Sequence, residues 1–149
     1  MADVVVDLVA PDELAEIVGL YNQIFRPPRD EDDFLRRYQG RYNILQMIAR
    51  VQERPVGFLT GFELKPRIFF IWFIGVLPSH RRNGAASQLL EACYSWIRQR
   101  DYEAVRCECF NRQKSMLQLA LADEYDIIGL RWDTDHGDNL ILLQKTLAL

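Results

Sequence analysis

The sequence predicts a mixed α/β domain whose central sheet is mostly antiparallel and carries helices on both faces. Residues 68–77 are apolar at almost every position, which is typical of a strand buried on both faces in the middle of a covered sheet. Residues 84–100 place apolar side chains at helical spacing. Residues 43–51 and 56–64 are strand-like segments joined by a short polar turn, which indicates a hairpin.

The remaining elements follow in order along the chain. "VVVDLVA" (4–10) is rich in β-branched residues and predicts a strand, and an amphipathic helix then opens at Pro11 and Asp12 and runs to Phe25. "RPPRDEDD" ends that helix. The later elements are a short helix over 34–38, the three strands named above, the helix over 84–100, a strand over 104–110, a helix over 112–122, and strands over 127–133 and 140–147. No repeat or linker divides the chain, so we expect one domain over 1–149.

Composition excludes several classes of protein. With 149 residues, 49% hydrophobic and 26% charged, the chain fits a globular domain rather than a disordered one. The net charge of −3 and a pI of about 5.4 argue against a nucleic-acid partner. The longest apolar run is shorter than the roughly 20 residues that span a bilayer, and the first residues carry acids where a secretory signal carries bases. We therefore expect no membrane partner and a cytoplasmic location.

The cysteines and the polar turn near the C-terminal end give no sign of a metal. Cys93, Cys107 and Cys109 are odd in number and form no CxxC pair, so a disulfide framework or zinc site is not expected. Cys107 and Cys109 share one face of a strand, as buried structural thiols or, alternatively, as a reactive pair. "DTDHGDN" (133–139) lacks the later carboxylate of a calcium loop and is interpreted as a turn.

The stretch "PSHRRNGAAS" (78–87) has the chemistry of an anion site. The first turn of a helix leaves backbone N–H groups without partners, and the helix dipole makes that end positive. Gly84, Ala85 and Ala86 keep side-chain bulk away from this backbone, while Arg81 and Arg82 add positive charge. The alternative is a solvated surface turn.

"GVLPSHRRNGAASQLLEAC" resembles the acyl-CoA-binding segment of the GNAT superfamily of N-acetyltransferases. Val76 and Pro78 match its strand end, and Arg81, Gly84 and Ala86 match its Q/R-x-x-G-x-G/A loop. The hairpin "RPVGFLTGF" and the strand "VRCECFNRQKSM" extend the likeness from about residue 43 to 147, whereas residues 1–42 match in element order only.

The resemblance implies acetyl-CoA as cosubstrate and a set of residues that bind it. Its pyrophosphate would sit on backbone N–H groups from Arg82 to Ala86, its pantetheine would pair with the backbone around Val76, and the N–H near Ile74 would face the thioester carbonyl. Asn111 would reach the pantetheine or act as a helix N-cap. The implied binding residues are Val76, Leu77, Pro78, Arg81, Arg82, Asn83, Gly84, Ala85, Ala86 and Asn111.

The catalytic side chains that many relatives carry are not in their usual places. Gln118 stands where the family has a tyrosine acid, and Phe70 stands where some members have a glutamate base. Glu63 and Glu108 are the candidate substitutes, with surface positions as their alternative. Tyr125 is a candidate acid or a core residue.

The resemblance implies transfer of an acetyl group to a primary amine by direct attack, with a small-molecule or protein amine as acceptor. The alternative is a non-catalytic acyl-CoA-binding or regulatory module on the same fold. The acids of residues 29–33 would steer a cationic amine or, alternatively, begin a helix. The exposed final strands suggest a homodimer.

Overall fold

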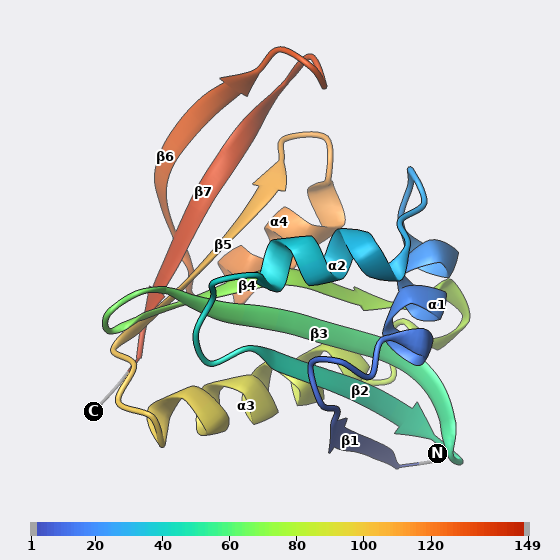
Figure 1. The fold of residues 1–149 in the computed structure, drawn as a ribbon. Helices are drawn as coiled ribbons and strands as arrows, with labels where there is room; N and C mark the ends of the chain where they lie inside the picture. Colours follow the sequence, from blue (N-terminus) through green and yellow to red (C-terminus); the bar gives the residue numbers. More distant parts are fainter. Residues whose placement is uncertain (1–2, 148–149) are drawn as a thin grey trace.

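The computed structural model describes residues 3–147 of this chain and shows a seven-stranded sheet in the order β1-β2-β3-β4-β5-β7-β6 (Figure 1). The predicted mixed α/β class and the predicted order of elements are confirmed. Residues 1, 2, 148 and 149 of the expected domain lie outside the described residues. The elements are β1 (Val4–Leu8), α1 (Ala15–Ile24), α2 (Glu31–Tyr38), β2 (Leu45–Val51), β3 (Arg54–Lys65), β4 (Ile68–Val76), α3 (Ala85–Arg98), β5 (Ala104–Phe110), α4 (Lys114–Ala122), β6 (Asp126–Asp133) and β7 (Asp138–Thr146).

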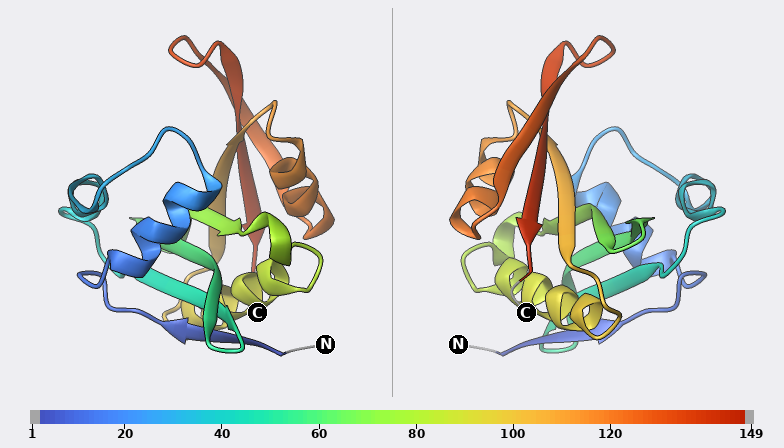
Figure 2. Two further views of the ribbon diagram at one scale, coloured as in Figure 1. Left: turned by 90° about the vertical axis from the view of Figure 1, so that its right-hand side faces the viewer. Right: turned by 90° about the vertical axis from the view of Figure 1, so that its left-hand side faces the viewer.

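Helices cover both faces of the sheet, with α1 and α2 on one side and α3 and α4 on the other (Figure 2). Because successive strand residues point to opposite faces, each central strand contributes side chains to the hydrophobic cores on both sides of the sheet. In β3, Phe58 packs in the α1–α2 core and Leu59 in the α3–α4 core. In β4, Phe70 and Phe69 divide in the same way. The prediction that residues 68–77 form a central strand buried on both faces is therefore confirmed.

Two helices begin later than the sequence indicates. Pro11 and Asp12 form a turn, and α1 begins at Ala15. The predicted start of α4 at residue 112 and the role of Asn111 as its N-cap are both wrong, since the N-cap is Gln113. The reason is that the N–H of Asn111 donates to the carbonyl of Asn139 at 2.9 Å, which keeps the chain paired with β7 for one residue past β5.

The acids of residues 30–33 begin α2. The carboxylate of Asp30 accepts from the N–H of Asp33, and the carboxylate of Asp33 accepts from the N–H of Asp30, which is a capping box. This helix-starting role, the second of the two interpretations, moves the start of α2 from residue 34 to Glu31.

The three cysteines are buried structural thiols. Cys93, Cys107 and Cys109 all pack in the core between the sheet and α3–α4. Burial raises the pKa of all three thiols, that of Cys107 to about 12. Since the thiolate is the reactive form, these side chains are inert near neutral pH.

The longest helix, α3, has 14 residues. None of the helices in residues 3–147 combines the length and the apolar character needed to cross a bilayer. The apolar segment that stands out in the sequence is instead strand β4, at the centre of the sheet.

The sheet opens at its centre, between β4 and β5. These parallel strands pair over only three residues, from Ile68 with Ala104 to Phe70 with Arg106. Just beyond, Thr60 of β3 pairs with Phe73 and Gly61 pairs with Ile71, which leaves Trp72 as an extra residue, a β-bulge. Past this bulge β4 stays with β3 while β5 follows β7, and the two halves diverge (Figure 2).

The glycine opposite the bulge leaves no room for a side chain. A Cβ on Gly61 would overlap the carbonyl oxygen of Phe70 and come within 2.7 Å of the Phe69 ring. We expect Gly61→Ala to lower the free energy of unfolding by about 1–3 kcal/mol, measured by urea denaturation.

The matched control is Gly19→Ala in α1, where a Cβ meets no atom within 4 Å. Removing this glycine from an exposed helix position should raise the free energy of unfolding by about 0.4–1 kcal/mol. Equal effects of the two substitutions would contradict the tight packing at the bulge.

Candidate active site

A cleft of about 940 Å³ occupies the opening between β4 and β5. Its walls come from α1, the segment that leads to α2, the second half of β4, the end of β5 and the start of α4. Six of the lining residues carry the chemistry: Arg29, Arg37, Ile74, Val76, Arg81 and Glu108.

The edge of β4 that faces this cleft has backbone groups without a neighbouring strand. The N–H of Leu77 donates to the carbonyl of Val56 at 2.8 Å, and the register from Gly57–Val76 to Thr60–Phe73 is regular. Antiparallel pairs alternate between bonded and non-bonded, so Ile74 and Val76 turn their N–H and C=O away from β3 and toward the cleft. Arg81 takes part here, because its Nε donates to the Val76 carbonyl at 3.2 Å.

The loop after β4 leads directly to the N-terminus of α3. Gly84 is the N-cap of this helix, with a left-handed φ of +87° that residues with side chains rarely adopt. A Cβ on Gly84 would meet no atom within 4 Å, so the space beside the helix start is open. Arg81 and Ala86 line the cleft, whereas Arg82 is exposed and also has a positive φ. These features fit an anionic ligand.

Asn111 lies in the turn between β5 and α4, beside the cleft but not among its lining residues. Its side-chain oxygen accepts a hydrogen bond from Nζ of Lys114 at 2.9 Å. The neighbouring side chains of Gln113 and Ser115 do line the cleft.

The two candidate glutamates occupy different places. Glu108 of β5 lines the cleft, on the face opposite to the buried Cys107 and Cys109, as the strand alternation predicts. Glu63 lies outside the cleft, where its carboxylate accepts from the hydroxyl of Tyr102 at 2.8 Å.

Gln118 is exposed and does not line the cleft, whereas Phe70 does. Tyr125 is a core residue: it is buried, and its hydroxyl lies 2.8 Å from that of Tyr94. Burial, reinforced by the nearby Cys107, raises the pKa of Tyr125 above its usual range. Neither Gln118 nor Tyr125 supplies an acid to the cleft.

Arg29 and Arg37 form a cationic wall that the sequence analysis did not identify. Their guanidinium carbons lie 5.6 Å and 5.7 Å from the ring centre of Trp72, and Nε of Arg29 donates to the hydroxyl of Tyr21 at 3.0 Å. Trp72 and Phe73 both face this wall because the bulge puts two successive side chains on one side of the sheet. Arginines rather than the acids of α2 line this wall.

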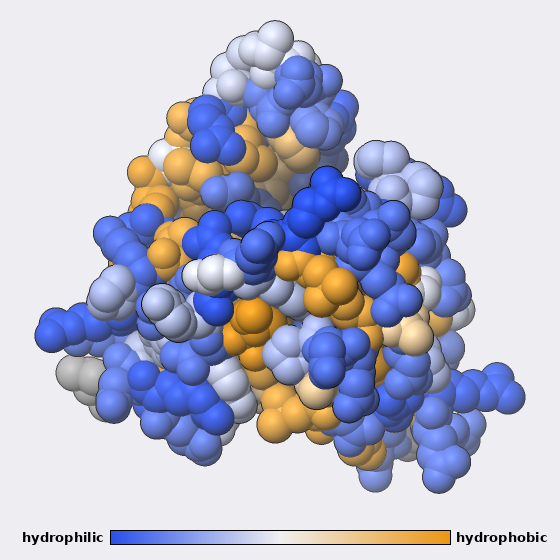
Figure 3. All heavy atoms as spheres, in the orientation of Figure 1, coloured by the Kyte–Doolittle hydropathy of each residue, from blue (hydrophilic) through white to orange (hydrophobic). Residues whose placement is uncertain are grey.

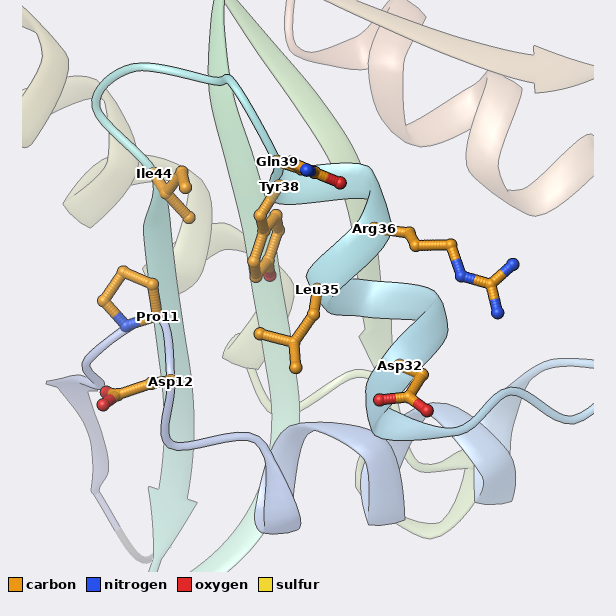
Figure 4. Close-up of a pocket in the computed structure, with 8 residues that line it drawn as sticks. All are labelled: Pro11, Asp12, Asp32, Leu35, Arg36, Tyr38, Gln39 and Ile44. Carbon is orange, nitrogen blue, oxygen red and sulfur yellow. The ribbon is translucent and has the colours of Figure 1, made fainter.

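A second, smaller depression of about 480 Å³ lies on the other side of α2 (Figure 4). Leu35 and Tyr38 point from the helix toward Pro11 and Ile44, whereas Arg36 points away. The Tyr38 hydroxyl already bonds to Gln46 and Thr60. This depression therefore combines an apolar floor with the charged side chains of Asp12, Asp32 and Arg36.

Within residues 3–147, no group of three or more His, Cys, Asp and Glu side chains is arranged to hold a metal ion. His136, the histidine that lines the cleft, is bonded to Asp133 at 3.1 Å. The chemistry available in the cleft thus includes backbone N–H groups, arginines, one histidine and one carboxylate.

The comparisons with solved structures show the fold. The ribosomal-protein-S18-alanine N-acetyltransferase from Escherichia coli superposes with a TM-score of 0.84 at 14% identity, over 99% of this chain and 96% of that one. Ard1 from Thermoplasma volcanium superposes with a TM-score of 0.84 at 16% identity, over 98% of this chain and 99% of that one. The third structure is yncA from Salmonella typhimurium, a putative acetyltransferase solved with its cofactor acetyl-CoA. It superposes with a TM-score of 0.78 at 13% identity, over 99% of this chain and 96% of that one.

No curated protein sequence matches this chain significantly. The profile described as the acetyltransferase (GNAT) family, however, matches residues 12–121, which is most of the chain and includes β4, the loop and α3. The chain therefore belongs to the GNAT family of acetyltransferases, enzymes that take their acetyl group from acetyl-CoA.

Proposed function

We propose that this protein transfers the acetyl group of acetyl-CoA to a primary amine by direct attack, without a covalent enzyme intermediate. The observation that carries the proposal is the opening between β4 and β5, where the exposed backbone edge of Ile74 and Val76 leads to the open N-terminus of α3. One continuous surface thus offers hydrogen bonds to an extended amide chain and a positive end to a phosphate.

Each part of acetyl-CoA has a partner in this arrangement. The pyrophosphate would bind the N–H groups of residues 82–86 with the charge of Arg81, and the pantetheine would run along the backbone of residues 76–78. The N–H of Ile74 would stabilise the oxyanion that forms when the amine attacks. Asn111 would contact the pantetheine once its side chain leaves Lys114.

Glu108 is the proposed general base. An ammonium group has no free electron pair, so the acceptor must lose a proton before it attacks. Glu108 is the only acidic residue lining the cleft in the part of the chain that the structure describes. A water molecule between the carboxylate and the amine would relay the proton. The leaving thiolate needs little help, because a thiol has a pKa near 8.5.

The rival function is a non-catalytic acyl-CoA-binding module, and the missing tyrosine and glutamate favour it. The test is a thiol-release screen of acetyl-CoA against a panel of amines, combined with calorimetry. Binding with turnover supports the enzyme. Binding without turnover of any amine supports the module, and absence of binding contradicts both.

The pyrophosphate site predicts a specific effect of charge at Gly84. Gly84→Ala and Gly84→Glu share the strain of a side chain at positive φ, and only the glutamate adds negative charge where phosphate should bind. By calorimetry, the Kd for CoA should be at least about tenfold higher in Gly84→Glu than in Gly84→Ala.

The helix itself should tolerate the glutamate, because an acid at a helix N-terminus contributes roughly 0.3–1 kcal/mol of stability. The Tm of Gly84→Glu should therefore equal or exceed that of Gly84→Ala. Equal CoA affinity in the two variants would show that the loop is an ordinary surface turn.

The assignment of the base predicts that Glu108→Gln lowers kcat/KM by about 10²–10⁴-fold with the best amine of the screen. The Kd for acetyl-CoA should stay the same, since the substitution removes a charge on the acceptor side. The matched control is Glu63→Gln, outside the cleft, where the amide oxygen can still accept from Tyr102. If the two variants were equally active, Glu108 would not be the base.

We also propose that the protein works in a reducing compartment, the cytoplasm, and forms a homodimer. The three cysteines are all free, which supports the first statement. The second rests on the edge strand β6, where Ile128, Leu130 and Trp132 alternate along one face and are 46%, 64% and 61% exposed. Figure 3 shows hydrophobic side chains gathered on the projecting β6–β7 arm. Such an exposed apolar edge commonly pairs with another chain.

The dimer predicts that Leu130→Glu yields a monomer in sedimentation equilibrium, whereas the native chain sediments at twice the monomer mass. The control is Leu35→Glu, another exposed leucine, which lies on α2 away from this arm. A native monomer, or a dimer that survives Leu130→Glu, would contradict the proposed interface.

A further inference from the structure

The acceptor side of the cleft is strongly cationic. Arg26, Arg29 and Arg37 line it from α1–α2, while Arg112 and Lys114 line it from the start of α4. Within residues 3–147, Glu108 is the one acid that lines the cleft, and Asp138 outside it pairs with Arg112 at 3.8 Å. A polyamine or a lysine-rich peptide would be repelled by this positive charge, which favours an acceptor that carries a negative group as well as its amine.

Arg29 and Arg37 are the two cations best placed to bind a ligand. Both are half-buried, and both guanidinium groups lie beside Trp72 at the bulge of β4. Among the residues that the structure describes, neither has a carboxylate oxygen within 4.0 Å of its nitrogens. Aromatic rings surround both guanidinium groups, and no carboxylate of residues 3–147 forms an ion pair with either.

The positive charges also act on one another. Burial lowers the pKa of the Arg37 guanidinium, and the charges of Arg41 and Arg29 lower it further. The charge of Glu108 works in the opposite direction, which shows that Glu108 and Arg37 are near enough to interact. Partly buried cations without partners are costly, and a bound anion would remove that cost.

We propose that the acceptor is a small amine that also carries a carboxylate, of the amino-acid type, and that Arg29 and Arg37 bind its carboxylate while its amine lies at Glu108. This inference rests on the proposed acetyl transfer and adds the class of acceptor. A guanidinium pair suits a carboxylate because each presents N–H donors in a fixed plane. Since Glu108 and Arg37 face each other across one cleft, amine and carboxylate belong to one small molecule.

The experiment compares amino acids with their amides, which have the same amine and no carboxylate, in the thiol-release assay. The native enzyme should prefer the acid by at least about tenfold in kcat/KM. Arg37→Gln should remove most of this preference by raising KM for the acid. It should bring the ratio of kcat/KM for the acid to kcat/KM for the amide close to one, and it should leave the Kd for acetyl-CoA unchanged within about twofold.

The control is Arg36→Gln, the adjacent arginine on the same helix, which lies at the other depression and is not among the residues that line the cleft. It should keep the native preference for the acid. An equal loss in Arg36→Gln and Arg37→Gln would mean that general charge, rather than a carboxylate site, sets the preference, and would overturn the inference.

Different results would contradict the proposed acetyl transfer and the proposed class of acceptor. If amides or diamines react as well as the acids, acetyl transfer stands and the carboxylate site is wrong. If peptides with a free N-terminus react better than any amino acid, the small acceptor is wrong. If acetyl-CoA binds and no amine of any kind releases thiol, the proposed function fails, and the inference fails with it.

Discussion

The extra residue in β4 is the constraint on which the rest of this structure depends. A buried strand normally has partners on both edges, because unpaired backbone N–H and C=O groups are costly away from water. Here the bulge at Trp72 comes directly after the last pair that β4 makes with β5. The second half of β4 therefore keeps one partner strand and leaves its other edge to a ligand. In the proposed function, the cosubstrate would take the place of the missing strand.

The same bulge determines what the acceptor meets. A regular strand would send Trp72 and Phe73 to opposite faces, whereas the bulge sends both toward α1 and α2. These rings are the surface against which Arg29 and Arg37 rest. The cleft thus has two cationic ends with different origins, the N-terminus of α3, where we propose that phosphate binds, and the arginine wall, where we propose that the acceptor binds. Separate sites of this kind let one enzyme bind two anionic molecules without competition between them.

The sequence predicts the parts of this arrangement that depend on local patterns. The uniform apolar character of residues 68–77 is enough to place β4 at the centre, and Gly84 with Arg81 marks the loop. The bulge is not visible in the sequence, because a bulge is defined by the register of β4 against β3 and not by the order of apolar residues in β4 alone. In the sequence, Arg29 and Arg37 look like ordinary surface charges, because their environment also depends on tertiary contacts. Only the tertiary structure half-buries them and leaves them without an ion pair among residues 3–147. The late start of α4 likewise depends on a long-range contact, the bond between Asn111 and Asn139.

The missing family residues make sense once the strands are placed side by side. Phe70 stands where some relatives have a glutamate base, and it pairs across the parallel strands with Arg106. Residues two apart on a strand share a face, so Glu108 lies on the same face as Phe70, one step further into the opening. Under the proposed function, the base would stand on β5, the strand facing β4, and still line the cleft. Phe70 can then be apolar and join the core beneath the acceptor.

An acid at the position of Gln118 is also dispensable, because the thiolate is a tolerable leaving group near neutral pH. The demands that remain are removal of the amine's proton and stabilisation of the oxyanion, and in the proposed mechanism Glu108 would meet the first and the backbone of β4 the second.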